Sequence, residues 1–242
     1  MKIIPLQEGS FTIDKTKVFV PFNKNTDDLY KRAQGSLLVE VQPFVVITKK
    51  DIILIDTGLG FENNGMLQLH ENLISKGIQP NDVTKVLLSH LHKDHAGGIS
   101  KKDGSLSFAN AKYYVQQREL DDALQQNSPS YIIEELMPLK DSLQLFALTE
   151  DKGLIDDYIS YEITAAHSKY HQVFWLKEDD EIIFFGADDA PQLQQMKHKF
   201  VAKYDYDGKK CMELRKQWWQ QGEYEHWTFL FYHDIKHATI KL

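Results

Sequence analysis

The amino-acid sequence predicts an α/β (α+β) fold in which two β-sheets pack together and are covered by helices. Short β-branched or apolar runs, each bounded by turn residues, recur in both halves of the chain. Segments with the spacing of amphipathic helices lie at intervals between these runs. The length of 242 residues is ordinary for one layered domain with a sizeable core. We therefore expect residues 1–242 to form a single domain.

Most of the first half is predicted to form strands with tight connections. Pro43 and the polar turn at residues 49–51 separate several of the runs. Helices are expected at residues 66–76, where Gly77 ends the helical spacing, and at about residues 117–126. The expected strands cover residues 10–20, 37–41, 44–48, 52–55, 83–89 and 112–115.

The second half repeats this pattern. A helix is expected at about residues 208–221, and at least one of its two tryptophans, Trp218 and Trp219, is expected in the core. The segment 128–153 is expected to be helical or irregular, and it is our candidate for the wall of a substrate pocket. The expected strands cover residues 158–164, 172–176, 181–185 and 227–232.

The composition restricts the class of protein. Apolar residues make up 42% and charged residues 26% of the chain, as in soluble globular proteins. A net charge of −7 disfavours a nucleic-acid partner, and no apolar stretch has membrane-spanning length. The N-terminal segment lacks the apolar core of a signal peptide, and the lone Cys211 cannot form an internal disulfide. We expect a cytoplasmic protein with a small-molecule substrate, and a homodimer is left open.

The motif that bears most on function is HxHxDH, formed by His90, His92, Asp94 and His95. Three imidazoles and one carboxylate within six residues cannot all bind one ion, but on a tight loop they can bind two. Imidazole and carboxylate suit zinc and its first-row neighbours, and the absence of thiolate argues against a closed structural zinc site. The competing interpretation is a loop of solvated histidines.

Three further residues of ligand type follow predicted strands. His167, Asp188 and His233 each stand just after an apolar run. Side chains at the ends of several strands converge on one edge of a rigid scaffold, where functional sites are built. A carboxylate such as Asp188 can bridge two cations that lie roughly 3.5–4 Å apart.

These residues fall within five segments that resemble the metallo-β-lactamase superfamily in order and spacing. The resemblance extends along nearly the whole chain and implies a four-layer αββα sandwich with a dinuclear metal site. The segments are LIDTG at residues 54–58, SHLHKDHAGG at 89–98, AAHSKYH at 165–171, FFGADD at 184–189 and FYHD at 231–234.

The resemblance also implies two ligand sets. One metal ion would take His90, His92 and His167. The other would take Asp94, His95 and His233, and Asp188 would bridge the two. We expect two divalent ions, with zinc favoured and manganese or iron as alternatives.

The residue types indicate a branch of the superfamily. The commonest zinc β-lactamases have a cysteine where this chain has Asp188, whereas glyoxalase II and the acyl homoserine lactone lactonases have an aspartate. The chain is similar to that branch, with two departures. Pro191 stands where the lactonases carry a tyrosine, and Tyr170 replaces a small residue near His167. The pattern therefore indicates a hydrolase of this branch but does not single out a lactonase.

The expected enzyme is a dinuclear metal-dependent hydrolase of a small ester, thioester or lactone. A metal-bridging hydroxide would attack the carbonyl carbon, and Asp94 or a metal-bound water would protonate the leaving group. Asp56 is expected to hold a ligand histidine in the required tautomer. The open alternatives are an iron-dependent sulfur oxygenase, a phosphodiesterase, and a non-catalytic, metal-stabilised binding protein. Metal content separates the oxygenase, which would hold one iron, from the hydrolase.

No motif identifies the substrate. Specificity is expected to lie in residues 128–153 and 191–206. We expect His171 to pack beside the site and His198 to lie at the surface. The sequence leaves open which of five side chains line the pocket: Tyr170, His171, His198, Tyr204 and Tyr206.

Overall fold

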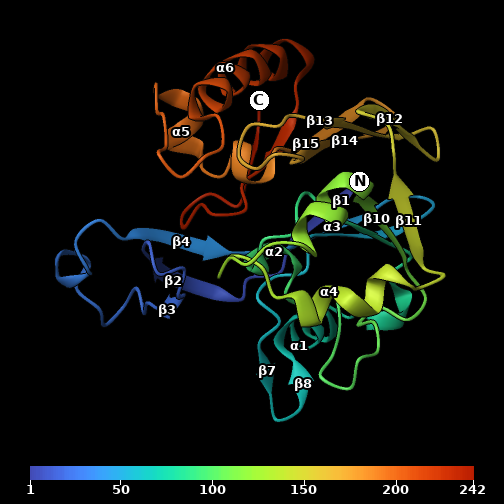
Figure 1. Ribbon diagram of the computed structural model, residues 1–242. Helices are drawn as coiled ribbons and strands as arrows, with labels where there is room; N and C mark the ends of the chain where they lie inside the picture. Colours follow the sequence, from blue (N-terminus) through green and yellow to red (C-terminus); the bar gives the residue numbers. More distant parts are fainter.

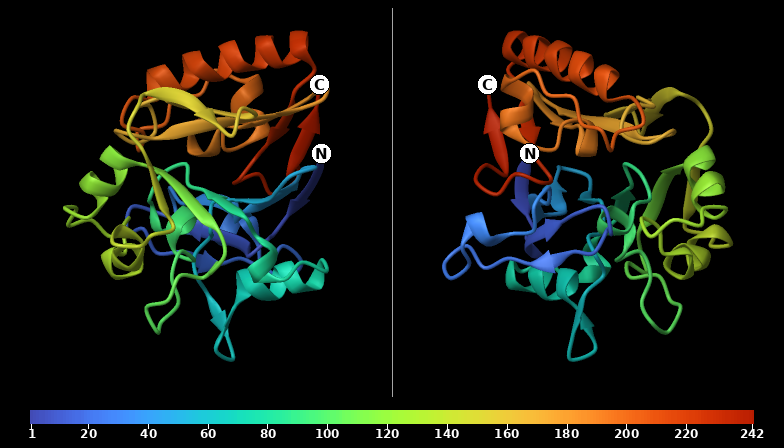
Figure 2. Two further views of the ribbon diagram at one scale, coloured as in Figure 1. Left: turned by 90° about the vertical axis from the view of Figure 1, so that its right-hand side faces the viewer. Right: turned by 60° about the vertical axis from the view of Figure 1, so that its left-hand side comes forward.

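Two six-stranded β-sheets face one another in the computed structural model, which describes residues 1–242 (Figures 1 and 2). The first sheet comes from the N-terminal part of the chain and has the order β1-β5-β6-β9-β10-β11. The second comes from the C-terminal part and has the order β12-β13-β14-β15-β16-β17. Each half of the chain therefore contributes one sheet.

The first sheet is antiparallel at one side and parallel at the other. β1, β5 and β6 pair antiparallel, whereas β6, β9, β10 and β11 run parallel. Parallel strands bring their carboxyl ends to the same edge, so the loops that follow β6 and β9 lie side by side. The strands are Lys2–Pro5 (β1), Phe44–Ile47 (β5), Ile52–Ile55 (β6), Lys85–Leu87 (β9), Lys112–Gln116 (β10) and Leu145–Leu148 (β11).

The second sheet is an antiparallel meander from β12 to β15, followed by a parallel pairing of β15 with β16. That pairing places the carboxyl ends of β15 and β16 together. The strands are Lys152–Ile155 (β12), Ile159–Ile163 (β13), Gln172–Glu178 (β14), Glu181–Phe185 (β15), Thr228–Leu230 (β16) and Thr239–Lys241 (β17).

Helices cover the outer faces of both sheets. Figure 2 shows α6 along the outer face of the second sheet and α1 below the first. None of the helices combines the length and apolar character that crossing a bilayer requires. The α-helices are Gln68–Ser75 (α1), Lys93–Ala96 (α2), Gln117–Ala123 (α3), Ile133–Lys140 (α4), Leu193–Lys197 (α5) and Gly208–Glu225 (α6). Short 3-10 turns occupy Leu29–Lys31 (η1), Pro80–Asp82 (η2) and Ala187–Asp189 (η3).

Two small sheets complete the fold. β2 (Gly9–Ile13) pairs with both β3 (Val20–Pro21) and β4 (Leu37–Val41), and β7 (Glu62–Asn63) pairs with β8 (Met66–Leu67). Figure 1 shows the three-stranded unit, in blue, extending to one side of the molecule below α5.

Three apolar clusters separate the layers. The central one lies between the sheets, where Leu87 of the first sheet and Phe185 of the second are both fully buried. A second cluster packs α1, α3 and α4 against the first sheet, and a third packs Trp218 of α6 against Phe184. Because each sheet is apolar on both faces, the fold has four layers, as expected from the sequence.

Most predicted elements are present, and those in the first half that differ do so for local reasons. The strand expected at 10–20 ends at Ile13, because the Asp14 carboxylate accepts hydrogen bonds from the backbone and hydroxyl of Thr16 and turns the chain. The helix expected at 66–76 begins at Gln68, because Met66 and Leu67 pair with β7.

The prediction that residues 128–153 are helical or irregular was wrong in part. The segment contains α4, but it also contains β11, which adds to the first sheet parallel to β10. β12 then begins at Lys152 and opens the second sheet. The segment therefore passes from one sheet to the other along the outer edge of the sandwich.

Candidate metal centre

The HxHxDH motif lies in the turn that follows β9 and in the short helix α2. β9 is buried in the first sheet and delivers His90, which is fully buried, at its carboxyl end. His92 is the N-cap of α2, and Asp94 and His95 lie on that helix. One tight turn therefore presents all four side chains to the same edge of the sandwich.

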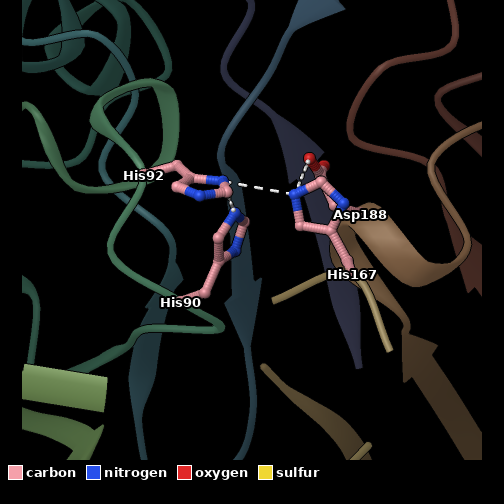
Figure 3. Close-up of side chains that lie close together, drawn as sticks. All are labelled: His90, His92, His167 and Asp188. Atoms are coloured by element: carbon pink, nitrogen blue, oxygen red, sulfur yellow. Dashed lines mark hydrogen bonds and ion pairs between the residues drawn. The ribbon is translucent and has the colours of Figure 1, made fainter. Parts of the chain in front are cut away.

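Four side chains form a first cluster, which Figure 3 shows. Nε2 of His90 lies 2.9 Å from Nδ1 of His92, and that Nδ1 lies 3.2 Å from Nε2 of His167. Asp188 Oδ2 lies 3.1 Å from the same nitrogen of His167. His90 and His92 come from the first sheet, while His167 follows β13 and Asp188 follows β15 of the second. The two sheets therefore meet at this cluster.

Asp94, His95 and His233 form a second cluster beside the first. Asp94 Oδ2 lies 3.4 Å from Nε2 of His233 and 3.7 Å from Nε2 of His95. His233 follows β16, so this cluster also draws on both sheets. In each cluster the ligand-type atoms lie within 4.8 Å of one another.

Asp188 stands between the clusters with one oxygen toward each. Its Oδ1 lies 2.9 Å from Nε2 of His233 and 3.1 Å from Nε2 of His95. Its Oδ2 faces His167 of the first cluster. The structure thus brings together all seven residues that the sequence indicated as ligands.

The donor set fits divalent cations. Two imidazole nitrogens on one tetrahedral zinc ion lie about 3.3 Å apart, since each Zn–N bond is about 2.0–2.1 Å long. The separations between His92 Nδ1 and its two neighbouring imidazole nitrogens, 2.9 and 3.2 Å, are close to that value. Nε2 of His95 and Oδ1 of Asp188 are buried and, although they lie 3.1 Å apart, neither makes a hydrogen bond. Buried polar atoms are costly without partners, and a bound cation would supply one.

The protonation states of His90, His92 and Asp188 suit metal binding. At His95, His167 and His233 the charges of Asp188 and other carboxylates together outweigh burial and raise the pKa, so that a bound cation would have to replace a proton on those three rings. Burial lowers the pKa of His90 and His92 well below its ordinary value, so both rings are neutral and have a free lone pair. Burial opposes ionisation of Asp188, but His233, His95 and His167 hold the pKa of its carboxyl well below its usual range. Neutral imidazole and ionised carboxylate are the forms that bind zinc-type metals.

Four of the five histidines in the clusters make a hydrogen bond through the ring nitrogen that points away from the clusters. Such hydrogen bonds fix the tautomer and orient the ring toward a metal. The partners of the Nδ1 atoms are Ser89 Oγ at 3.0 Å from His90, Asp56 Oδ2 at 2.7 Å from His95, Asp205 Oδ1 at 2.9 Å from His167, and the Glu40 carbonyl at 2.7 Å from His233.

Asp56 makes the contact that the sequence predicted. It follows β6 and adopts a left-handed backbone conformation with φ 56°. Its Oδ1 accepts a hydrogen bond from the Ser89 backbone at 2.8 Å, and its Oδ2 accepts one from the Ser89 hydroxyl at 2.8 Å. Asp56 therefore ties the end of β6 to the ligand-bearing turn after β9.

Sequence reasoning missed several supporting residues. Asp205 and the Glu40 carbonyl stand in no motif, so no sequence signal identifies them. Tyr232 stacks on His95, with ring centroids 4.1 Å apart, and donates a hydrogen bond to the Asp94 carbonyl at 2.6 Å. Its position next to His233 in the chain was the one feature of the sequence that could have identified Tyr232 as a supporting residue.

His171 and Asp189 lie just behind the first cluster. His171 is fully buried, and its Nδ1 lies 3.0 Å from Asp189 Oδ2, so it packs beside the site as expected. The other Asp189 oxygen accepts a hydrogen bond from the His167 backbone at 2.7 Å and one from Cys211 Sγ at 3.4 Å. Asp189 therefore anchors His167 as well as shaping the η3 turn.

The clusters open into a cleft of about 1140 Å³. Its walls come mainly from residues 13–39 and 191–204, and only Ser130 represents the segment 128–153. The prediction that 128–153 forms the pocket wall was therefore wrong, because that segment follows the outer edge of the sandwich. His198 and Tyr204 line the cleft, whereas Tyr170, His171 and Tyr206 do not.

Solved structures share this fold over almost the whole chain. A probable metal-dependent hydrolase from Staphylococcus aureus aligns with a TM-score of 0.81 at 20% identity, covering 99% of this chain and 91% of that one. AidC, a dizinc quorum-quenching lactonase in complex with a product, aligns at 0.75 and 18% identity, covering 98% and 88%. The hydrolase AbOPH of the beta-lactamase superfamily aligns at 0.74 and 24%, covering 99% and 89%.

At such low identity these likenesses establish the fold and not the substrate. A comparison with curated protein sequences gives no match. The family model for the metallo-beta-lactamase superfamily matches residues 39–188, which is more than half of the chain and includes six of the seven clustered residues. The chain therefore belongs to the metallo-beta-lactamase superfamily.

Proposed function

We propose that this protein is a dinuclear metal-dependent hydrolase that cleaves a small ester, thioester or lactone. The observation that carries the proposal is the position of Asp188, which directs one carboxylate oxygen toward each cluster. A site for one ion would need only the first cluster. The second cluster adds three further ligand-type residues, which supports a pair of ions.

His90, His92 and His167 would hold one ion, and Asp94, His95 and His233 would hold the other. The chemistry that such a pair supplies when bound is activation of water at neutral pH and polarisation of a substrate carbonyl. Imidazole and carboxylate ligands suit zinc, manganese and iron, and we favour zinc.

We assign to Asp94 the transfer of a proton to the leaving group: its carboxylate would take up the proton that the attacking water releases and pass it to the leaving oxygen or sulfur. Its carboxylate lines the cleft and lies 3.4 Å from Nε2 of His233. The hydrogen bond from Tyr232 to the Asp94 carbonyl holds this turn of α2 in place. A proton donor must lie within reach of the reacting atoms, and the place of Asp94 in the cleft lining supports this assignment.

The similar structures give limited support on substrate. AidC was solved with N-hexanoyl-L-homoserine, the product of its lactonase reaction, and several other similar structures are N-acyl homoserine lactone hydrolases at 20–21% identity. They make a lactone one candidate among esters and thioesters. A cytoplasmic location and the option of a homodimer remain predictions from the sequence.

The first test is metal content, measured by mass spectrometry on protein purified without chelator or added metal. We expect two ions per chain and hydrolysis of at least one member of a panel of esters, thioesters and lactones. One iron per chain with oxygen consumption on thiols would overturn the proposal in favour of an oxygenase. Turnover of phosphodiesters alone would show that the enzyme is a phosphodiesterase, which attacks phosphorus and not a carbonyl carbon.

A matched pair of variants separates the site from the fold. Asp188→Ala should lower kcat/KM at least about a hundredfold and reduce metal content, because both clusters lose a ligand. Asp180→Ala is the control, since Asp180 lies exposed in the turn between β14 and β15. Wild-type turnover and metal content in Asp188→Ala would contradict the proposed site.

A further inference from the structure

The cleft is lined by more cations than anions, although the whole chain carries a net charge of −7. Its four carboxylates belong to Asp14, Asp94, Asp188 and Asp234, and two of these are candidate metal ligands. The seven cationic side chains are Lys15, Lys17, Arg32, Lys93, Lys199, Lys203 and Lys236. The positive lining is therefore a local feature and does not follow from the overall composition.

None of these seven side chains forms an ion pair. Ion pairs of lysine and arginine occur elsewhere, as between Lys85 and Asp51 at 2.5 Å or between Lys24 and Glu40 at 2.7 Å. No carboxylate oxygen lies within ion-pair distance of any of the seven cationic groups that line the cleft. Their charge is consequently available to a bound anion.

Two of these cations are tied most directly to the segments around the metal centre: Lys93 adjoins His92 and Asp94 in the chain, and Lys17 precedes Phe19, whose ring the Lys93 ammonium faces. Lys93 stands between two candidate ligands in the chain, is half-buried, and points its ammonium toward the Phe19 ring at 6.0 Å. Lys17 lines the same cleft as His92 and Lys93.

The same cleft has a substantial apolar surface. Phe19 and Leu38 come from the N-terminal segment of the lining, and Phe200, which is 38% exposed, comes from the segment after α5. The remaining apolar lining residues are Ile13, Leu29, Leu37, Val39, Pro191 and Ile235. An apolar wall beside free ammonium groups is complementary to a molecule that is both apolar and anionic.

We infer that the substrate is an amphipathic anion: an ester, thioester or lactone with an apolar chain and, away from the scissile carbonyl, a carboxylate or phosphate that Lys17 and Lys93 bind. This inference rests on the proposed hydrolase function. The other cations that line the cleft, among them Lys15, Lys199 and Lys203, attract such a molecule into it. A neutral ester of the same length gains only the apolar contacts.

Equilibrium binding tests the inference without requiring turnover. Hexyl phosphate, hexanoate and hexanol are titrated calorimetrically into the metal-loaded enzyme, into K17Q/K93Q and into K76Q/K140Q. Lys76 and Lys140 are exposed, unpaired and outside the cleft, so the second double variant is the charge-matched control. Because Lys93 adjoins candidate ligands, metal content is measured for every variant, and K17Q alone serves as a variant distant from them in the chain.

We expect at least one anion to bind at least tenfold more tightly than hexanol to the wild type and to the control. We expect that preference to fall about tenfold or more in K17Q/K93Q, and partly in K17Q, since hydrogen bonds between charged groups are the strong ones. The anion with the higher affinity identifies the group as phosphate or carboxylate. Unchanged anion binding in K17Q/K93Q would overturn the inference, because the anion would then be held by the metal ions alone.

A matched pair of substrates separates failure of the inference from failure of the hydrolase proposal. Mono-4-nitrophenyl adipate carries a terminal carboxylate that 4-nitrophenyl hexanoate lacks. A preference of tenfold or more for the adipate in kcat/KM, lost in K17Q/K93Q, supports the inference. Equal hydrolysis of both esters overturns it and leaves the hydrolase intact. Lysine-dependent anion binding with no hydrolysis of any ester supports the anion site and overturns the hydrolase.

Discussion

The carboxylate of Asp205 lies 2.9 Å from Nδ1 of His167, although 38 residues separate them. Two backbone hydrogen bonds fasten this contact, from Tyr206 to the His167 carbonyl at 3.0 Å and from Asp207 to the Ala166 carbonyl at 2.7 Å. The side chain of Asp205 is 2% exposed, so solvent weakens the contact little. The segment before α6 thus orients His167 so that its Nε2 faces the first cluster.

Asp205→Asn should weaken the first metal site. An amide can accept the proton of Nδ1 but carries no charge, so His167 becomes a poorer donor to a cation. We expect metal affinity or kcat/KM to fall 10- to 100-fold, as measured by metal retention during dialysis and by steady-state kinetics. Asp121→Asn on the exposed face of α3 is the control. Wild-type metal retention in Asp205→Asn would show that the contact does not support the site.

Asp56→Asn should act on the second cluster. Asparagine tolerates the left-handed backbone at this position, so the change tests the hydrogen bonds and not the turn. The amide replaces one acceptor oxygen by a donor, which then faces Ser89 or His95. We expect a loss of about 1–3 kcal/mol in the free energy of unfolding, measured with urea, and loss of one ion per chain before the other. Equal loss of both ions would contradict this assignment.

Removal of metal should lower thermal stability in wild-type protein. Ions that bind only the folded state stabilise it by mass action, by about 2.7 kcal/mol for each ion at a hundred times its Kd. Chelation should therefore lower Tm by several degrees, and added zinc should restore it. In Asp188→Ala the fall in Tm on chelation should be smaller than in wild type, because this variant binds less metal. An identical Tm with and without metal would argue that the clusters bind no ion.

The sequence located the ligands better than it located the cleft. Each of the seven clustered residues follows a strand or lies in the HxHxDH turn, and strand ends meet at an edge whatever the details of the loops. The boundaries of β6 and β15 could be predicted because their apolar runs stop abruptly at Asp56 and Gly186. These signals are local, so one sequence is enough to detect them.

The cleft depends on contacts between distant segments, which leave no local pattern. β2 and β4 pair across 23 intervening residues and bring Lys17 and Phe19 to the site. The edge strand β11 was missed because its Phe146 and Ala147 are exposed, so the run lacks the pattern of a half-buried strand. Asp205 was missed for the same reason as Lys17, since its role depends only on tertiary packing.

Glu8→Gln should change how stability depends on pH. Burial raises the pKa of Glu8 to about 8, the hydrogen bond from the Leu59 backbone opposes this, and the charge of Asp94 adds to it. Between about pH 4.5 and 8 the folded protein therefore holds a proton that the unfolded chain releases. This contribution to stability is complete below pH 4.5 and is lost as the pH rises to 8, at about 1.4 kcal/mol per unit.

Glutamine does not titrate, so Glu8→Gln should gain stability relative to wild type as the pH rises from 5 to 8. The measurement is urea unfolding across this range in metal-free protein, because cations bound near Asp94 would themselves lower the pKa of Glu8. Glu134→Gln, on the exposed side of α4, is the control. Parallel pH profiles for wild type and Glu8→Gln would contradict the raised pKa.

Gly98→Ala should destabilise the protein and disturb the second cluster together. The HxHxDH turn ends in Gly97 and Gly98, and residues 57–60 press directly against them. A Cβ at Gly98 would lie 2.3 Å from the Thr57 carbonyl oxygen, while the Thr57 backbone donates a hydrogen bond to the His95 carbonyl at 2.6 Å. Relief of the clash must therefore move the backbone that positions His95.

We expect Gly98→Ala to lower the free energy of unfolding by about 1–3 kcal/mol and to weaken retention of one metal ion. Gly104→Ala is the matched control, because Gly104 has φ +79° but no atom within 4 Å of an added Cβ. Gly104→Ala should lower the free energy of unfolding by only about 1 kcal/mol, through backbone strain, and should leave the metal content unchanged. If Gly98→Ala lost stability but kept both ions at wild-type affinity, the glycine pair would serve packing alone and His95 would be positioned by Asp56.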